Sequence, residues 1–309
     1  MPSRRSRLLI LGWHNVEGTW TFPARPGWGR VGLAAQLSFL QRSAHVVPLE
    51  ESLAALAAGN ELPSRAVALT FDDGYADTLR LAVPMLEKRR LPATFFLVPD
   101  LLDGRPQAWW ETLGWAFRNS TAAALDDEGL LMPLDGIRAR RKAYEAMAER
   151  LKRRDRQARQ IAVERVVQQL APTGSPPGPE LFLNWSGAEE VLSRGFAVGS
   201  HTMAHAILTE ETAVEQQRDL ATSRQVLADR LGGEMPLLAY PNGTVRDFDA
   251  VTVDAARRAG YSAAVTTVDG FADAATPPYE TYRSVVYPER GPLDVLDAVR
   301  NARQEHAAG

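Results

Sequence analysis

Short apolar segments recur along the chain and alternate with amphipathic ones. Each apolar segment is four to six residues long and is bounded by Gly, Pro, Asp or Ser, as is typical of buried parallel strands. The expected strands are Leu8–Leu11, Val46–Leu49, Ala66–Phe71, Ala93–Val98, Phe196–Gly199, Leu237–Tyr240, Ala263–Thr266 and Ser284–Tyr287. Apolar spacing near i, i+3 and i+4 predicts helices at Leu33–Ser43, Leu79–Arg89, Ala188–Arg194, Thr212–Leu231, Phe248–Ala259 and Leu293–Arg303. This alternation predicts an α/β fold with a parallel sheet, and seven or eight such units favour a (β/α) barrel over an open sheet.

Residues 104–180 interrupt the alternation. They contain no convincing strand, and Ile137–Leu170 is a long, strongly charged helical stretch that ends in a Pro- and Gly-rich loop. We therefore expect one barrel domain over residues 1–309, with a mostly helical insertion at 104–180 beside the barrel mouth. The Arg/Lys run of the insertion is either a solvated helix face or a patch for an anionic glycan or membrane surface.

Charge and composition exclude several classes of partner and site. The net charge of −3 provides no basic field for nucleic acid. The chain has no cysteine, so a metal would have to be held by His, Asp or Glu. The apolar run Leu8–Leu11 is shorter than a signal peptide needs, and no stretch reaches the ~20 apolar residues of a membrane span. We expect a cytoplasmic protein without an integral membrane segment; the sequence does not indicate its oligomeric state.

The segment Leu69-Thr70-Phe71-Asp72-Asp73-Gly74-Tyr75 carries the strongest local signal. An apolar strand runs directly into two adjacent carboxylates, and the carboxyl ends of parallel strands form the active face of such folds. Two adjacent acids repel each other unless a cation or a proton accompanies them. Taken alone, the segment could equally be an Asp-Asp-Gly turn that caps a helix.

A second signal is His201-Thr202-Met203-Ala204-His205, which follows the expected strand Phe196–Gly199. Two histidines at i and i+4 can bind one ion, although this spacing also arises by coincidence. Together with one carboxylate, they would form a metal site that leaves positions open for water and substrate. The second carboxylate could then act as a base.

The TFDDG and HTMAH segments resemble the first two motifs of the polysaccharide deacetylases, also called carbohydrate esterase family four. The resemblance covers about residues 8–100 and 181–290 and implies a distorted (β/α)7 barrel. It implies that Asp72 is the general base. It also implies that Asp73, His201 and His205 bind the metal, which would be zinc, with cobalt or nickel as alternatives.

A third family motif resembles Tyr240-Pro241-Asn242-Gly243, and it implies that the backbone N–H of Asn242 stabilises the developing oxyanion. The family's motif arginine, which orients the base, falls at Ala239. Arg283 or Arg246 could take its place.

The family's late catalytic histidine is also missing. The nearest histidine to the C-terminus is His306, in a polar tail that we expect to be disordered. However, Trp13-His14-Asn15 resembles the start of the poly-N-acetylglucosamine deacetylase branch, which implies that His14 is the catalytic acid. Alternatively, His14 only packs at a strand end; His45 is expected to be structural.

Aromatic residues near the expected barrel mouth are candidates for sugar binding. Trp109 and Trp110 open the insertion and could stack on a sugar face, or they could form the insertion core. We take the substrate-binding residues to be Tyr75, Trp109, Trp110, Tyr240 and Arg283.

These features predict a metal-dependent hydrolase that removes N-acetyl groups from an amino-sugar polysaccharide, oligosaccharide or glycan precursor. One alternative is an amidase that acts on a small non-sugar amide. Another is a catalytically inactive carbohydrate-binding protein, which the missing motif arginine and late histidine would suit.

Overall fold

A parallel sheet of eight strands forms the centre of the computed structural model, which describes residues 6–23, 25–105 and 108–308. Seven strands follow one another in the order β10-β1-β3-β4-β7-β8-β9, and β2 pairs with β3 beside this path. The strands are β1 (Leu8–Trp13), β2 (His45–Val46), β3 (Ala66–Phe71), β4 (Thr94–Leu97), β7 (Ala197–Ser200), β8 (Leu237–Ala239), β9 (Ala263–Val265) and β10 (Ser284–Val285). The prediction of a strand at Val46–Leu49 is wrong in its second half, because β2 ends at Val46 and a helix begins at Leu49.

The sheet closes irregularly between β9 and β10. The chain just before β10 bridges to β9, where Thr281 N donates to Ala264 O at 3.1 Å and Thr266 N donates to Thr281 O at 2.9 Å. This irregular closure of a seven-strand path confirms the predicted distorted (β/α)7 barrel.

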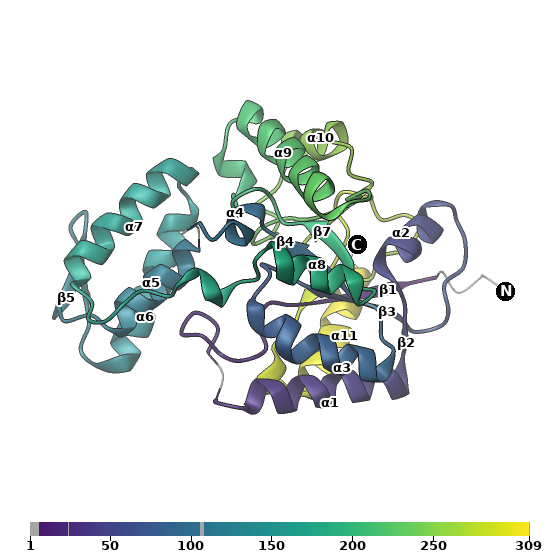
Figure 1. The fold of residues 1–309 in the computed structure, drawn as a ribbon, viewed down its shortest axis with the longest axis horizontal. Coiled ribbons are helices and arrows are strands. Elements are labelled where there is room, and N and C mark those ends of the chain that lie inside the picture. Colours follow the sequence, from purple (N-terminus) through teal and green to yellow (C-terminus); the bar gives the residue numbers. More distant parts are fainter. Residues whose placement is uncertain (1–5, 24, 106–107, 309) are drawn as a thin grey trace.

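Helices surround the sheet on its outer face (Figure 1). Helices α1, α3 and α11 lie on one side of the molecule, and α9 and α10 lie on the opposite side. Their bounds are α1 (Trp28–Ser43), α2 (Leu49–Ala57), α3 (Val83–Arg89), α4 (Pro99–Leu102), α8 (Trp185–Ser193), α9 (Ala213–Leu231), α10 (Ala250–Arg258) and α11 (Pro292–Ala308). A π-helical turn, Thr78–Ala82, leads into α3. The prediction of a disordered C-terminal tail is wrong, because α11 continues past His306.

The strands are buried on both faces, as expected for a parallel sheet under helices. In β1, Leu9, Leu11 and Trp13 pack in the core beneath the helices. Leu8 and Ile10 point the other way, into the cluster that fills the barrel interior. This two-sided burial explains why the sequence shows continuous apolar runs rather than alternation.

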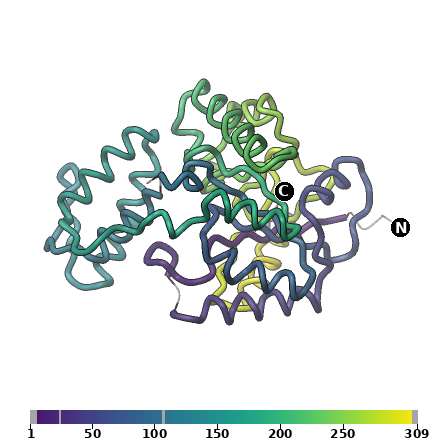
Figure 2. The backbone as a smooth tube through the Cα atoms, viewed as in Figure 1, coloured from purple at the N-terminus to yellow at the C-terminus, as the bar shows by residue number. Residues whose placement is uncertain are grey.

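The insertion leaves the barrel after β4 and returns before α8, forming a separate lobe (Figures 1 and 2). It contains α5 (Trp109–Arg118), α6 (Gly136–Lys152) and α7 (Arg156–Leu170) around its own apolar cluster. The predicted absence of strands is wrong. An antiparallel hairpin joins β5 (Ala124–Asp127) to β6 (Leu130–Pro133) through Glu128 and Gly129, whose φ angles of 56° and 88° suit a two-residue hairpin turn.

The predicted single helical stretch Ile137–Leu170 is two helices. The first helix, α6, ends at Lys152. Asp155 then caps the start of α7, because its side chain accepts a hydrogen bond from Ala158 N at 2.8 Å. Some arginines of the insertion form ion pairs within the lobe. Arg150 and Arg165 both bind the buried carboxylate of Asp127, at 2.7 and 2.6 Å.

Among the described residues, no helix combines the length and the apolar composition that crossing a bilayer would require.

Candidate metal and catalytic site

The predicted chemical residues converge at the carboxyl ends of the strands. Asp72 and Asp73 follow β3, His201 follows β7, and His14 follows β1. A cavity of about 480 Å³ opens here; its lining includes His14, Asp72, Asp73, His201, His205 and Asn242. Parallel strands end at one edge of a sheet, so residues nearly 200 positions apart share one cavity.

The turn after β3 requires an unusual backbone. Asp73 has a φ of 67° and Gly74 a φ of 75°, both in the left-handed region that glycine tolerates best. A Cβ at Gly74 would also lie 3.0 Å from Leu97 Cδ2. The turn directs Asp73 toward the histidines and leaves Asp72 behind it.

The segment from His201 to His205 is a loop. Thr202 and His205 have φ angles of 64° and 53°. Thr202 Oγ1 accepts a hydrogen bond from Ala206 N at 3.0 Å, which stabilises the loop from inside. Strained non-glycine residues of this kind cluster at functional sites.

Asp73, His201 and His205 have the donor atoms and spacing of a metal site. Their three potential ligand atoms lie within 4.8 Å of one another. Asp73 Oδ1 is buried, has no hydrogen-bond partner among the residues that the structure describes, and lies 3.3 Å from both imidazole Nε2 atoms. Two ligand atoms that are each ~2.0–2.1 Å from a tetrahedral ion lie about 3.3 Å apart, so the group fits a divalent cation.

The imidazoles are prepared as ligands in different ways. His201 Nδ1 lies 2.8 Å from Ala239 O. When Nδ1 carries the proton and donates it to this carbonyl, Nε2 is left free to bind a metal. Burial lowers the pKa of His205 despite the attraction of Asp73. His205 is therefore a neutral imidazole near pH 7, the form that binds metals.

Asp72 forms a buried ion pair with Arg283. Arg283 Nη1 donates to Asp72 Oδ1 at 2.7 Å and to Thr70 Oγ1 at 3.1 Å. Burial raises the pKa of Asp72, but the charges of Arg283 and His201, together with the hydrogen bond from Arg283, lower the pKa below its ordinary value. Asp72 is thus an ionised carboxylate at neutral pH, as a base must be.

Arg283, rather than Arg246, is the arginine that contacts Asp72. The exposed Arg246 lies on the loop after β8. Arg283 is fully buried, is not among the residues that line the cavity, and faces Asp72 instead. Its Nε donates to Thr266 O at 3.0 Å, and its Nη2 is buried with no hydrogen-bond partner among the described residues.

The loop after β8 holds Asn242 at the cavity. Asn242 has a φ of 57°, and its carbonyl accepts a hydrogen bond from Thr267 Oγ1 at 2.6 Å. Gly243 follows with a φ of 67°, and a Cβ there would lie 2.9 Å from Thr267 N. Tyr240 lines the cavity, but its hydroxyl donates to Tyr279 O at 3.0 Å, so only its ring is free for contact.

His14 lies at the cavity wall as expected from its place after β1. Its ring stacks on Phe22, with ring centroids 4.9 Å apart. The ring is half-buried and faces the same cavity as Asp72. His45 is exposed and contacts Ser64 O instead, consistent with the structural role expected for it.

The aromatic residues expected to bind sugar are mostly buried. Trp109 and Trp110 are 7% and 6% exposed; both reach the cavity but belong to the insertion core. Tyr75 is 1% exposed and is not among the residues that line the cavity. Its hydroxyl is instead bound to Glu111 and Trp110.

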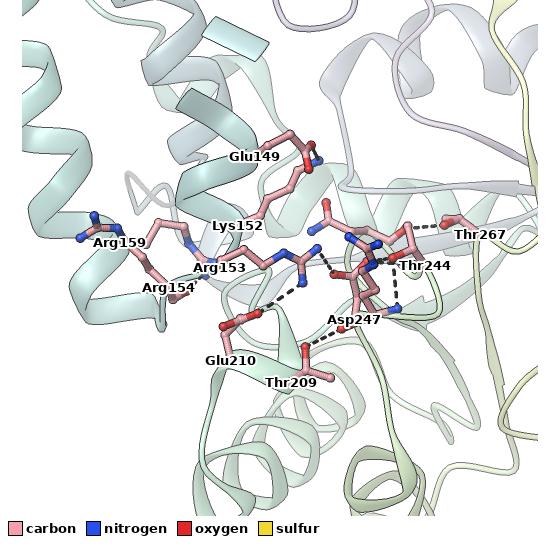
Figure 3. Close-up of polar contacts among 12 residues, drawn as sticks. Glu149, Lys152, Arg153, Arg154, Arg159, Thr209, Glu210, Thr244, Asp247 and Thr267 are labelled. Carbon is pink, nitrogen blue, oxygen red and sulfur yellow. Dashed lines mark hydrogen bonds and ion pairs between the residues drawn. The ribbon is translucent and has the colours of Figure 1, made fainter. Parts of the chain in front are cut away.

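The insertion supplies one wall of the cavity. Helix α6 contributes Tyr144, Glu149 and Lys152 to the lining. Just beyond its end, Arg153 reaches Glu210 and the buried Asp247 on the barrel, at 3.4 and 3.6 Å (Figure 3). The insertion therefore lies at the barrel mouth, where the sequence predicted it.

Sequence reasoning missed these wall residues. The α6 residues carry no motif, and only tertiary packing brings them to the strand ends. Phe22 and Glu111 were missed for the same reason, although Glu111 directly follows the predicted pair Trp109 and Trp110.

Asp219 of α9 supports the histidine loop and gives a prediction about stability. Its Oδ1 accepts a hydrogen bond from Met203 N at 2.7 Å, and burial raises its pKa from 3.8 to about 7. A pKa that is higher in the folded state makes folding less favourable as pH rises from about 4 to 7.

Asp219→Asn should therefore keep the bond to Met203 and remove this penalty. We expect urea unfolding to show a variant more stable than the wild type by about 1–2 kcal/mol at pH 8, a value reduced for the partial exposure of the side chain. The two proteins should have nearly equal stability at pH 4. A variant less stable at pH 8 would contradict this account of Asp219.

Comparisons with known proteins agree with this geometry. The family model described as polysaccharide deacetylase matches residues 59–264, more than half of the chain. YxkH of Bacillus subtilis, a protein named for the same family, is 28% identical over 115 residues. This match covers 37% of the chain and only 40% of the length of YxkH.

Solved structures share the fold at low sequence identity. The deacetylase PplD of Streptococcus pyogenes, solved with acetate, has a TM-score of 0.62 at 18% identity, covering 95% of this chain and 98% of its own. IcaB of Ammonifex degensii has a TM-score of 0.59 at 20% identity, covering 95% and 97%. A de-N-acetylase of Aggregatibacter actinomycetemcomitans has a TM-score of 0.59 at 16% identity, covering 95% and 100%. By its family match, the chain belongs to the polysaccharide deacetylase family.

Proposed function

We propose that this protein is a metal-dependent hydrolase that removes N-acetyl groups from an amino-sugar glycan. The observation that carries the proposal is the pairing of a metal-binding group with a separate base. Asp73, His201 and His205 offer three ligand atoms, and the adjacent Asp72 is kept ionised by Arg283. Metal-assisted amide hydrolysis uses both parts within one cavity.

The residues divide the reaction among them. Zinc is the metal we propose, since one carboxylate and two imidazoles suit it; when bound, it would acidify a water and polarise the acetamide carbonyl. Asp72 accepts the proton of the attacking water. The backbone N–H of Asn242 donates to the oxyanion of the tetrahedral intermediate. His14 donates a proton to the departing amine, and the products are acetate and a free amino sugar.

A glycan is the favoured substrate over a small amide. The cavity of about 480 Å³ is larger than an acetamide group needs, and it presents the rings of Phe22, Tyr240 and Tyr287 among polar groups. Named relatives include a deacetylase solved with acetate and a de-N-acetylase. An inactive binding protein is disfavoured for two reasons. Arg283 orients Asp72 in place of the motif arginine that is missing at Ala239. The base and the three metal-binding residues are also all present: Asp72, Asp73, His201 and His205.

A substrate panel tests this proposal. Purified protein with zinc would be incubated with N-acetylglucosamine, its oligomers, a polymeric form and simple amides such as acetanilide. We expect acetate release from the glycans at rates well above those from the simple amides. A preference for the simple amides would favour the amidase alternative, and no acetate from any compound would favour the inactive binding protein.

His14→Ala tests the assignment of the acid. An amine leaves poorly unless it is protonated, whereas an activated phenolate leaves without help. We expect kcat on acetamides to fall by about 10²-fold and the rate on p-nitrophenyl acetate to change little. Metal content, measured by mass spectrometry, should be unchanged. Equal losses on both substrates would indicate that His14 only packs at the strand end and is not the acid.

We further propose that residues 1–309 act as one unit in the cytoplasm, on a glycan precursor or lipid-linked intermediate. The α6 wall supports the first part, since the insertion completes the cavity. Cell fractionation with an antibody to the protein would test its location.

A further inference from the structure

The two imidazoles of the metal site differ in how they are held in place. His201 is held by the contact of its Nδ1 with Ala239 O. The Nδ1 of His205 is buried and has no hydrogen-bond partner among the described residues. A metal-binding histidine usually donates its second N–H to an acceptor that fixes the ring, so His205 needs another support.

The insertion provides a ring against His205. The centroids of the Trp110 indole and the His205 imidazole lie 4.3 Å apart with an interplanar angle of 45°. Trp110 is 6% exposed, and its contact with His205 joins the insertion to the metal site. Such a contact restricts the rotation of the imidazole, although it supplies no hydrogen bond.

Trp110 is itself fixed by a buried polar chain. Its Nε1 donates to Tyr75 Oη at 2.9 Å, and Tyr75 Oη donates to Glu111 Oε1 at 2.8 Å. Glu111 is 4% exposed and also accepts a hydrogen bond from Thr19 Oγ1 at 2.8 Å. The N–H of Trp110 and the O–H of Tyr75 each donate to a partner within this chain, which favours one orientation of the indole.

From this arrangement we infer that Trp110 is a positioning residue for the metal ligand His205, held in place by Tyr75 and Glu111. The inference rests on the proposed function in one respect, that the Asp73–His201–His205 group binds zinc. It explains why a buried indole projects from the insertion to the edge of the cavity. It also assigns Tyr75 and Trp110 to the support of the metal site in place of sugar binding.

The test is the affinity for zinc, which requires no catalytic activity. Isothermal titration of Zn²⁺ into metal-free protein would compare the wild type with Trp110→Ala, Trp110→Phe and Tyr75→Phe. Loss of an outer partner of a metal ligand typically weakens metal binding by about 10–100-fold, and we expect this for Trp110→Ala. Trp110→Phe keeps a ring beside His205 and should recover part of the loss. Tyr75→Phe should weaken binding by several-fold.

Trp115→Ala is the matched control, because Trp115 lies on the same helix, α5, and does not line the cavity. It should lower the melting temperature of the metal-free protein without changing zinc affinity. If Trp110→Ala fails to fold, the Trp110→Phe and Tyr75→Phe variants still decide. Zinc affinity within twofold of the wild type in all folded Trp110 and Tyr75 variants would overturn the inference.

Failure of the inference can be distinguished from failure of the proposed function. If the wild type binds zinc and the variants bind it equally well, only the role of Trp110 is wrong. If the wild type binds no zinc, the assignment of the metal site is wrong, and both the inference about Trp110 and the proposed function fail.

Discussion

Replacing Asp72 with asparagine should lower kcat for acetate release by about 10²–10⁴-fold while leaving the zinc content unchanged. Asparagine has nearly the same shape and can still accept a hydrogen bond from Arg283, but it cannot take a proton from water. Asp72 is not part of the group whose ligand atoms lie within 4.8 Å, so metal binding should persist. Steady-state kinetics and metal analysis on the same preparation would measure both quantities.

Asp254→Asn is a suitable control for this experiment. Asp254 is an exposed carboxylate on α10 whose ion pairs within the described part of the chain are with Arg257 and Arg258. Its variant should match the wild type in both rate and zinc content. Loss of zinc from Asp72→Asn would show that the roles of Asp72 and Asp73 are reversed.

Replacing His201 with alanine should remove the metal and reduce acetate release to background. The imidazole is buried, provides one of the three ligand atoms and is oriented by Ala239 O. Two remaining ligands cannot hold zinc tightly, and without the metal the acetamide carbonyl is not polarised.

The control here is His45→Ala, since His45 is exposed on β2. Circular dichroism should show that both variants fold. If His201→Ala retains a full equivalent of zinc, the assignment of the metal site is incorrect.

The barrel and its chemical residues could be predicted because local sequence specifies both. Ala66–Phe71 is a continuous apolar run, and its predicted and observed bounds coincide. Asp72 and Asp73 follow it directly, so the strand itself places them at the active edge. The same reasoning located His14 after β1 and His201 after β7.

Contacts between distant segments could not be predicted in the same way. Arg283 and Arg246 were equal candidates to support Asp72, because nothing in the local sequence decides which arginine is buried beside a residue 211 positions away. The structure resolves this, since Arg283 lies at the irregular junction of β9 and β10.

The insertion shows a further limit of local patterns. The hairpin was not predicted, because each of its strands is only four residues long and β5 ends in two aspartates. Tyr75 and Trp110 looked like residues that contact sugar. The N–H of Trp110 finds its partner in Tyr75 of the barrel, and the hydroxyl of Tyr75 finds its partner in Glu111 of the insertion. Local sequence does not reveal this pairing of distant segments.

The most direct test of the proposed activity is metal-dependent, stoichiometric deacetylation. Protein stripped with a chelator would be incubated with N-acetylglucosamine oligomers before and after addition of one equivalent of zinc, and acetate and new primary amine would both be quantified. We predict negligible product from the stripped protein, and equal amounts of acetate and amine once zinc is restored. Undiminished release by the stripped protein, or no release after zinc is restored, would contradict the account.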